Sequence, residues 1–289
     1  MSDQAIVFLT HVQSERVFDH FRRLRKETTG LLSTVLCIHY PNQWQSFTNR
    51  ALTKIRPSTK TIPSPHIRVD VKSGVRLLPN RFSQMQKRGG WFNNGFSDLC
   101  YMPALVNEQL LRYEYVWLVE NDVDYAGNWR DFFLSKMESS ADLIAAYIRA
   151  RVPDDDWYHW SWFRAPPEVL FAHHTQSFLA IARFSRRLLS LYVDAVRNDL
   201  WEGHTEALFP TIARYHGFTI SDLAPGAFCP EQWLGTSHGC GKQFDWAPTM
   251  QRAYFHEQPM LFLERNVLYH PVKAGWERKF TRPPISGSL

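Results

Sequence analysis

The chain of 289 residues has few cysteines, no long apolar run and no Gly-x-Gly-x-x-Gly fingerprint of a dinucleotide-binding fold. Its four cysteines show no Cys-x-x-Cys spacing, which is typical of reduced thiols in the cytoplasm and argues against a structural zinc site. The longest apolar stretches fall short of the roughly 20 residues that span a bilayer. The N-terminal segment, which carries Asp3, lacks the pattern of a signal peptide. We therefore expect a cytoplasmic protein, free or docked on the inner face of a membrane.

Aromatic residues are abundant, at 15% of the chain, and 11 of them are tryptophans. Core packing rarely requires so many indoles, because each is bulky and its N–H needs a partner. The flat faces of sugars stack well on aromatic rings, so a carbohydrate or nucleotide site is one explanation. A tryptophan-rich core is the other.

The formal net charge of +5 is unevenly distributed. Residues 54–88 contain nine basic side chains and a single acid, Asp70. Such a patch attracts phosphates, anionic lipid headgroups or nucleic acid, and the alternative is a solvated face. Arg76, Arg81 and Arg88 are the candidates for contacting a phosphate.

The first part of the sequence alternates between predicted strands and helices. The strands are expected at 5–11 and 32–39, and the helices at 14–27 and 42–55. This order predicts an α/β fold with a mostly parallel, Rossmann-like sheet, because parallel neighbours are joined by right-handed crossover helices.

The same alternation continues toward the C-terminus without an internal repeat or a clear linker, which predicts a single fused domain. Further helices are expected at 97–112, 129–137, 185–197 and 203–215, and further strands at 66–71, 115–119, 142–147, 177–182 and 218–220.

An acidic cluster, Glu120-Asn121-Asp122-Val123-Asp124, directly follows the apolar strand expected at 115–119. Ligands of open α/β sheets bind at the carboxyl ends of strands. Alternate residues of an extended segment project from one side, so Glu120 and Asp122, or Asp122 and Asp124, are a candidate pair for one divalent cation. Acids that cap a helix or bind water are the alternative.

The strand and its Glu-x-Asp motif resemble the apolar strand and Asp-x-Asp motif of GT-A glycosyltransferases. The continuation Val-Asp-Tyr-Ala-Gly-Asn-Trp is similar to a poorly characterised GT-A-like family with a Glu-x-Asp motif. This resemblance implies a GT-A-like fold and a nucleotide-sugar donor, UDP-sugar by default, bound with Mn²⁺ or Mg²⁺. Asp122 would be the main metal ligand, and Glu120 would lie near the metal or the ribose.

A second segment, Trp201–Phe209, places an acid in the first turn of a helix. The helix N-terminus favours an ionised carboxylate, as a general base requires. The segment resembles the start of the acid-bearing helix in inverting, mucin-branching N-acetylglucosaminyltransferases, where a Glu takes the proton of the acceptor hydroxyl. Glu206 matches that Glu, Thr205 replaces the preceding Asp, and Glu202 is the substitute base. A helix-start acid favoured only by the helix dipole is the alternative.

The third segment, Asn266–Lys273, contains His270 and Lys273, which resemble the C-terminal pair of many GT-A enzymes. There a His binds the metal, and a nearby Lys or Arg reaches the diphosphate. Imidazole is a competent ligand when neutral, and the Lys ammonium is a compact phosphate-binding charge. His173-His174 is a rival pair, and a structural histidine is the alternative.

Two aromatic segments supplement these motifs. Trp157, Trp160 and Trp162 are the candidate acceptor platform, or a lid that reaches a membrane-bound acceptor. The glycine-rich residues 89–96 are a candidate loop near the base or the sugar, and Arg88, just before them, is the candidate diphosphate contact.

The sequence thus indicates an inverting, metal-assisted glycosyltransferase, hexosyl- or N-acetylhexosaminyl-, acting on a glycan or glycolipid acceptor in polysaccharide synthesis. Residues 1–125 would form the nucleotide-sugar-binding half and residues 126–289 the acceptor-binding and catalytic half. The alternatives are a retaining GT-A enzyme, a nucleotidyltransferase, and a non-enzymatic binder of nucleic acid or polyanionic glycan. Nucleic acid is disfavoured, because no recognised nucleic-acid motif is present.

Overall fold

The computed structural model describes residues 3–40, 62–89, 95–125, 127–197, 200–223 and 268–270. The chain divides into two compact units. Unit 1 comprises residues 1–121 and 139–223, and unit 2 comprises residues 122–138 and 224–289. No helix in the described ranges is long and apolar enough to cross a membrane.

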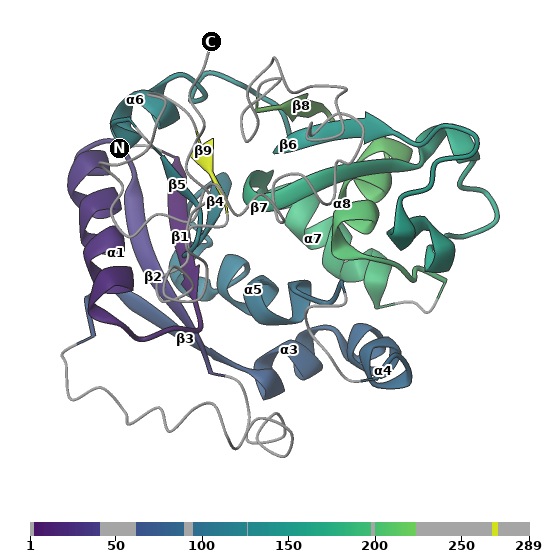
Figure 1. Ribbon diagram of the computed structural model, residues 1–289, viewed down its shortest axis with the longest axis horizontal. Coiled ribbons are helices and arrows are strands. Elements are labelled where there is room, and N and C mark those ends of the chain that lie inside the picture. Colours follow the sequence, from purple (N-terminus) through teal and green to yellow (C-terminus); the bar gives the residue numbers. More distant parts are fainter. Residues whose placement is uncertain are drawn as a thin grey trace, which may run out of the picture. The chain divides into compact units, whose positions relative to one another are not determined.

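Unit 1 is built on a seven-stranded sheet with the order β3-β2-β1-β4-β7-β6-β8 (Figure 1). β7 runs antiparallel to its neighbours β4 and β6, while all the other neighbouring pairs are parallel. The predicted α/β class, with a mostly parallel sheet flanked by helices, is confirmed. The strands are β1 (Gln4–Thr10), β2 (Ser33–Tyr40), β3 (His66–Asp70), β4 (Tyr115–Glu120), β6 (Leu143–Ala150), β7 (Thr175–Ser185) and β8 (Ile220–Asp222).

Helix α1 (Glu15–Thr28) covers one face of the sheet, beside β1 and β2 in Figure 1. It begins where the Ser14 hydroxyl accepts a hydrogen bond from the backbone N–H of Val17 at 3.3 Å, a typical N-cap. Its apolar side meets Phe8 of β1, whose ring lies 5.8 Å from that of Phe21. The neighbours of Phe8 on the strand project to the opposite face, as the period of two requires.

That opposite face is covered by α3 (Val71–Leu77) and α5 (Asp98–Leu105), and α4 (Pro79–Lys87) packs on α3. Within α5, Pro103 has no N–H to donate to the Leu99 carbonyl, and Gly74 of α3 approaches that oxygen. A Cβ at Gly74 would lie only 2.3 Å from it, so glycine is required there. The helix expected at 97–112 therefore ends early, and a 3-10 helix follows at Glu108–Leu110.

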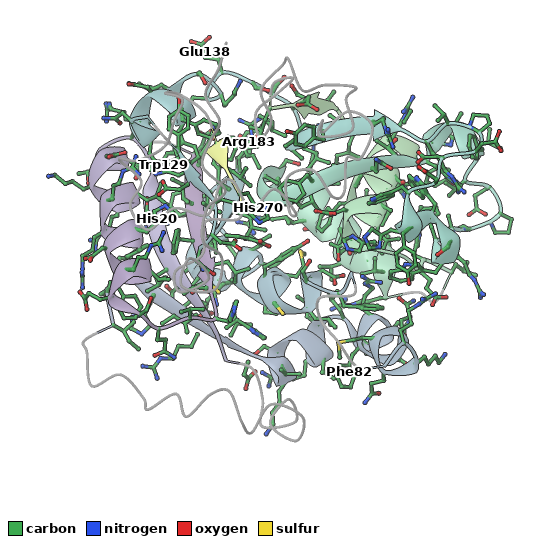
Figure 2. The ribbon with its side chains drawn as sticks, viewed as in Figure 1. His20, Phe82, Trp129, Glu138, Arg183 and His270 are labelled. Carbon is green, nitrogen blue, oxygen red and sulfur yellow. The ribbon has the colours of Figure 1, made fainter. Side chains whose placement is uncertain are left out.

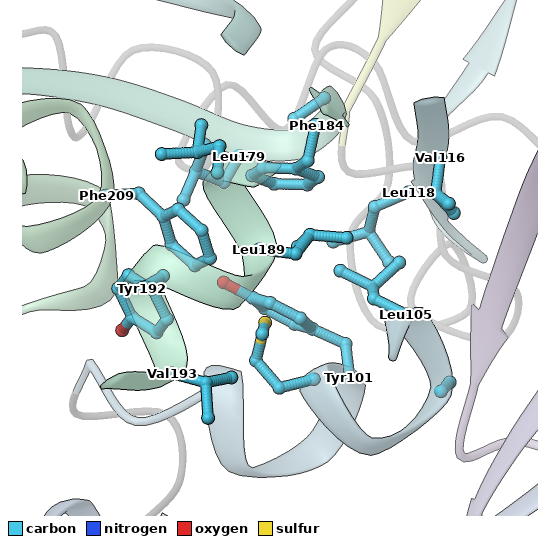
Figure 3. Close-up of a cluster of buried hydrophobic side chains, with 14 of the residues drawn as sticks. Tyr101, Leu105, Val116, Leu118, Leu179, Phe184, Leu189, Tyr192, Val193 and Phe209 are labelled. Atoms are coloured by element: carbon cyan, nitrogen blue, oxygen red, sulfur yellow. The ribbon is translucent and has the colours of Figure 1, made fainter. Parts of the chain in front are cut away.

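The same core continues under α7 (Arg186–Val196) and α8 (Thr205–Tyr215), which pack on β7 (Figures 1 and 3). Tyr192 of α7 stacks on Phe209 of α8 with ring centroids 3.6 Å apart. Leu118 of β4 and Tyr101 of α5 belong to the same buried cluster. Two further 3-10 helices, Tyr158–Trp162 and Phe171–His173, lie in the segment between β6 and β7.

Unit 2 has its own small aromatic core. It contains β5 (Asp124–Tyr125), α6 (Trp129–Leu134) and β9 (Leu268–Tyr269). Trp129 is fully buried, with its ring 5.5 Å from that of Tyr125 and 5.7 Å from that of Phe133. Helix α6 ends before the expected residue 137, and the helix expected at 42–55 lies outside the described residues.

Candidate functional site

The candidate cation ligands lie around the short sheet of unit 2. β5 pairs antiparallel with β9, so that Asp124 is opposite Tyr269 and Tyr125 is opposite Leu268. This pairing joins segments far apart in the sequence and brings His270, just after β9 and labelled in Figure 2, close to Asp122, just before β5. His270 Nε2 lies 3.6 Å from Asp122 Oδ1, and both residues are more than nine-tenths buried.

These residues fit a divalent cation. Two ligands of one ion, each about 2.1 Å from it, lie roughly 3.0–3.5 Å apart, so a small adjustment of the 3.6 Å pair would suffice. Glu120 is a further carboxylate, kept in reach because only Asn121 separates it from Asp122 along the chain. A set that mixes imidazole with carboxylates suits Mn²⁺ better than Mg²⁺, which prefers oxygen ligands.

Asp124 has a different environment. It is 2% exposed, and its Oδ1 accepts a hydrogen bond at 2.7 Å from the backbone N–H of Tyr125. Its carboxylate thus caps the backbone at the start of β5. Lys273, the expected diphosphate contact, lies outside the described residues.

The candidate base, Glu206, lies in the first turn of α8 in unit 1. One carboxylate oxygen accepts a hydrogen bond from the backbone N–H of Leu179, on β7, at 3.2 Å. The N-cap of the helix is His204, whose Nδ1 accepts from the backbone N–H of Glu206 at 3.2 Å. A backbone donor and the positive end of the helix both favour the ionised carboxylate.

The imidazole next to Glu206 is neutral. Burial, and then the neighbouring His159 and Arg81, lower the pKa of His204 well below its usual value. Burial also lowers the pKa of His159 to about 4, and its ring lies 3.8 Å from that of His204. The 3.6 Å approach of His204 Nδ1 to the Glu206 carboxylate is therefore not an ion pair.

A buried ion pair fixes the residues just before Glu206. The Arg81 guanidinium is fully buried, and its Nε donates to Asp98 at 2.7 Å. It also donates to the carbonyls of Gly203 at 2.9 Å and Gly95 at 2.7 Å. The hydroxyl of Thr205 donates to the same Gly95 carbonyl at 2.7 Å. Since Arg81 is enclosed and paired, its prediction as a phosphate contact is wrong.

The three tryptophans predicted as an acceptor platform are buried. Trp157 and Trp160 are each 4% exposed and pack against Ala207, the residue after Glu206. Trp162 is 7% exposed and belongs to the main core. Their positions support the start of α8 and offer little ring surface. The acceptor role stays a prediction.

Arg88 and Glu202 also have protein partners. The Arg88 guanidinium lies over the Trp162 ring at 4.0 Å and faces the Glu202 carboxylate at 3.6 Å. Arg164 lies 3.9 Å from the same carboxylate. Two cations therefore face Glu202, which disfavours it as a base, and Glu206 stays the candidate. The diphosphate role of Arg88 stays a prediction.

The rival histidine pair lies in the 150–175 segment. His174 stacks on Trp160 at 5.9 Å, and His173 contacts the ring of Tyr215 at 5.4 Å. Burial, and then Arg151 and His173, lower the pKa of His174. Among the described residues, the group found with metal-ligand geometry is that of Asp122 and His270 with Glu120.

The sequence-based predictions did not include His204, Asp98 and Tyr101 in the surroundings of Glu206. The Asn, Asp, Ser or Thr typical of an N-cap is absent at 204, so nothing marked that histidine as a cap. The helix pattern says nothing of the burial of Asp98 or of its partners Arg81 and Tyr192, which come from other helices.

Comparison with known proteins identifies no family for this chain. No protein-family model matches the chain. No curated protein matches it either. Among solved structures, the chain is similar to the apo form of mouse xyloside xylosyltransferase 1, with 14% sequence identity and a TM-score of 0.40 over 93% of this chain and 97% of that one. At this identity and TM-score, the likeness identifies neither a family nor a reaction.

Proposed function

We propose that this protein is a glycosyltransferase of the GT-A type. It would move a sugar from a nucleoside diphosphate sugar, UDP-sugar by default, to a hydroxyl of a glycan or glycolipid acceptor. The observation that supports this most is the proximity of Asp122 and His270, 3.6 Å apart. The two residues belong to separate sequence motifs, each of which predicts a metal ligand.

In this proposal, Glu206 is the general base of an inverting reaction. Its carboxylate takes the proton of the acceptor hydroxyl, whose oxygen forms a bond to the anomeric carbon of the donor. The bond from that carbon to the diphosphate oxygen breaks, and its electron pair leaves with the nucleoside diphosphate. The 3.2 Å hydrogen bond from Leu179 N–H favours the ionised carboxylate that a general base requires, and the neighbouring His204 ring is neutral.

Asp122 and His270, with Glu120, would hold Mn²⁺ or Mg²⁺. When bound, such an ion neutralises the diphosphate of the leaving group. Residues 1–125 and 126–289 remain our proposed donor and acceptor halves. A cytoplasmic location, with or without docking on a membrane, is likewise part of the proposal.

A thermal-shift screen of nucleoside diphosphates and their sugars, with and without Mn²⁺, tests the donor site. We expect one nucleotide series to stabilise the protein in the presence of the ion, since ligands that bind only the native state raise its stability. Asp122→Ala and His270→Ala should abolish the Mn²⁺-dependent part, and Asp124→Asn should serve as the nearby control. Absence of any stabilisation by nucleotides would contradict the proposal.

The anomeric configuration of the product decides between this reaction and a retaining one. For an inverting enzyme, Glu206→Gln should lower kcat by about 100-fold or more, because the acceptor proton has no base to receive it. Product with the configuration of the donor, or near-normal turnover in Glu206→Gln, would favour the retaining alternative.

A further inference from the structure

The hydroxyl of Tyr101, on α5, is buried without a hydrogen-bond partner in the described part of the chain. The residue is 1% exposed. Leaving a buried polar group without a partner is destabilising, and native proteins usually supply a water or a ligand. The nearby Tyr192 differs, because its hydroxyl donates to Asp98 at 2.7 Å.

The Tyr101 hydroxyl points toward the interface between β7 and α8. Figure 3 shows the phenol extending from α5 toward the side chains of Tyr192 and Phe209, with Leu179 above them. Leu179 donates its backbone N–H to Glu206, and Phe209 is one helical turn after Glu206 on α8. The phenol thus points toward the β7–α8 interface, where the Glu206 carboxylate is bound.

A second unpartnered hydroxyl, that of Ser177, lies at the same β7–α8 interface. Ser177 on β7 is fully buried, and its Oγ has no partner in the described ranges. It is two residues before Leu179, so the two side chains share a face of the strand. Thr175, two residues earlier again, accepts from Arg214 of α8 at 3.3 Å, which identifies this face as the one toward α8.

Burial keeps the hydroxyl of Tyr101 protonated. Burial raises the pKa of Tyr101 well above its usual value, followed by the effects of Tyr192, Asp98, Glu120 and Glu206. The phenol is consequently a hydrogen-bond donor at every working pH. It lies within the electrostatic reach of the Glu206 carboxylate.

We propose that Tyr101, Ser177 and Glu206 hold one buried water between α5, β7 and α8, and that Tyr101 is through this water a positioning residue for Glu206. Buried waters typically make about three hydrogen bonds, which these three groups can supply. The water donates to the carboxylate and accepts from the phenol. The water thereby holds the Glu206 carboxylate in the orientation that faces an acceptor. The positioning role rests on the proposed function, whereas the water site does not.

The arrangement predicts the direction of an effect on ionisation. A hydrogen bond to a carboxylate favours its charged form, so the water lowers the pKa of Glu206. The other ionisable groups that act on Tyr101 or pack beside Glu206 include His204 and His159, both neutral, the Arg81–Asp98 pair with Tyr192, and Glu120. None of these groups is changed by removing the Tyr101 hydroxyl.

Tyr101→Phe and Tyr192→Phe form a matched pair for the test. The free energy of unfolding is measured from pH 4 to 8 for each, with Glu206 present and in a Glu206→Gln background. The difference between the two backgrounds reports the native pKa of Glu206 by linkage. Tyr101→Phe should raise that pKa by about half a unit or more. Ser177→Ala should do the same, and Tyr192→Phe should not.

Each outcome decides the inference. Coincident Glu206-dependent profiles for Tyr101→Phe and the unmodified protein would overturn it. So would a Tyr101→Phe effect that persists unchanged in Glu206→Gln, because the phenol would then act on another group. No substrate is needed, so these results are separate from a failure of nucleotide sugars to bind. With an identified substrate, Tyr101→Phe should lower kcat about tenfold at constant KM.

Discussion

Asp98 and Glu206 are two carboxylates of unit 1 with opposite environments. Asp98 is fully buried and accepts hydrogen bonds from Arg81 Nε at 2.7 Å, from the Tyr192 hydroxyl at 2.7 Å and from the Leu99 N–H at 3.1 Å. The Glu206 side chain retains 16% exposure and faces a neutral imidazole. A carboxylate whose oxygens are enclosed by donors stabilises the fold, whereas one that is partly exposed can still exchange a proton.

The largest effect is expected from removing the enclosed carboxylate. Asp98→Ala leaves the Arg81 charge buried without its partner, which typically costs about 3–5 kcal/mol of unfolding free energy. Glu206→Gln should cost less than about 1 kcal/mol while abolishing transfer. Chemical denaturation of both variants checks this contrast, and similar stability losses would remove the distinction between the two carboxylates.

A smaller but still large effect is expected at Gly95, whose carbonyl accepts from Arg81 and Thr205. Its φ of +93° is unfavourable for other residues, and a Cβ would lie 2.5 Å from the His204 ring and 2.9 Å from its Cα. Gly95→Ala should cost about 3 kcal/mol or more. Gly30, at φ +76° with nothing within 4 Å of a Cβ, is the matched control. We expect about 1–2 kcal/mol for Gly30→Ala, and equal costs would rule out a steric contribution at Gly95.

Acid is expected to lower the free energy of unfolding moderately, because the histidines near Glu206 are neutral in the native state. Burial lowers the pKa of His159 from 6.5 to about 4. Between these values the unfolded chain binds a proton that the native state does not. The free energy of unfolding should therefore fall as the pH falls from 6.5 toward 4, by up to about 1.4 kcal/mol per pH unit.

His159→Gln removes this contribution, so its stability should depend less steeply on pH over the same range. A residual slope is expected in the variant, because burial also lowers the pKa of His39 to about 4 and lowers the pKa values of His174 and His204. Urea denaturation at several pH values measures both slopes. An unchanged slope in His159→Gln would mean that this histidine is protonated in the native state.

The smallest effect on stability is expected at Arg88, a partly exposed cation beside Glu202 and Trp162. Exposed pairs contribute roughly 0–1 kcal/mol, so Arg88→Gln should unfold almost as the unmodified protein does. A loss of nucleotide affinity of about tenfold would support the predicted diphosphate contact. Unchanged affinity would leave Arg88 as a support for Trp162, beside the residues that precede α8.

Local sequence patterns predict much of the fold. Short apolar runs at 5–11, 32–39 and 115–119 are typical of buried parallel strands, and the structure has β1, β2 and β4 there. The helix predicted at 97–112 was too long, since α5 ends at Leu105 and a separate 3-10 helix follows it. The close Gly74–Leu99 contact was also not predictable, because it depends on packing between helices. The antiparallel direction of β7 is likewise absent from the pattern, since apolar periodicity does not encode strand direction.

The candidate site, like the fold, was predictable only in part from the sequence. The acidic cluster after β4, the acid at the start of α8 and a C-terminal histidine were all selected from residue type and position. That His270 lies 3.6 Å from Asp122 depends on a two-residue pairing between β5 and β9, which is too short to predict. The burial of Trp157 and Trp160 against Ala207 was equally unforeseen, because tryptophan suits both cores and sugar sites.

The sequence by itself determined the α/β class, most of the elements and the residues with chemistry worth testing, because those properties follow from periodicity and from side-chain type. The tertiary structure decided which charges are enclosed and which remain available. Arg81 and Arg88 are alike in the sequence, yet one is fully buried with Asp98 and the other lies over Trp162 near the surface. Burial and partners arise from contacts between distant segments, and these contacts set the charge state and reach of each group.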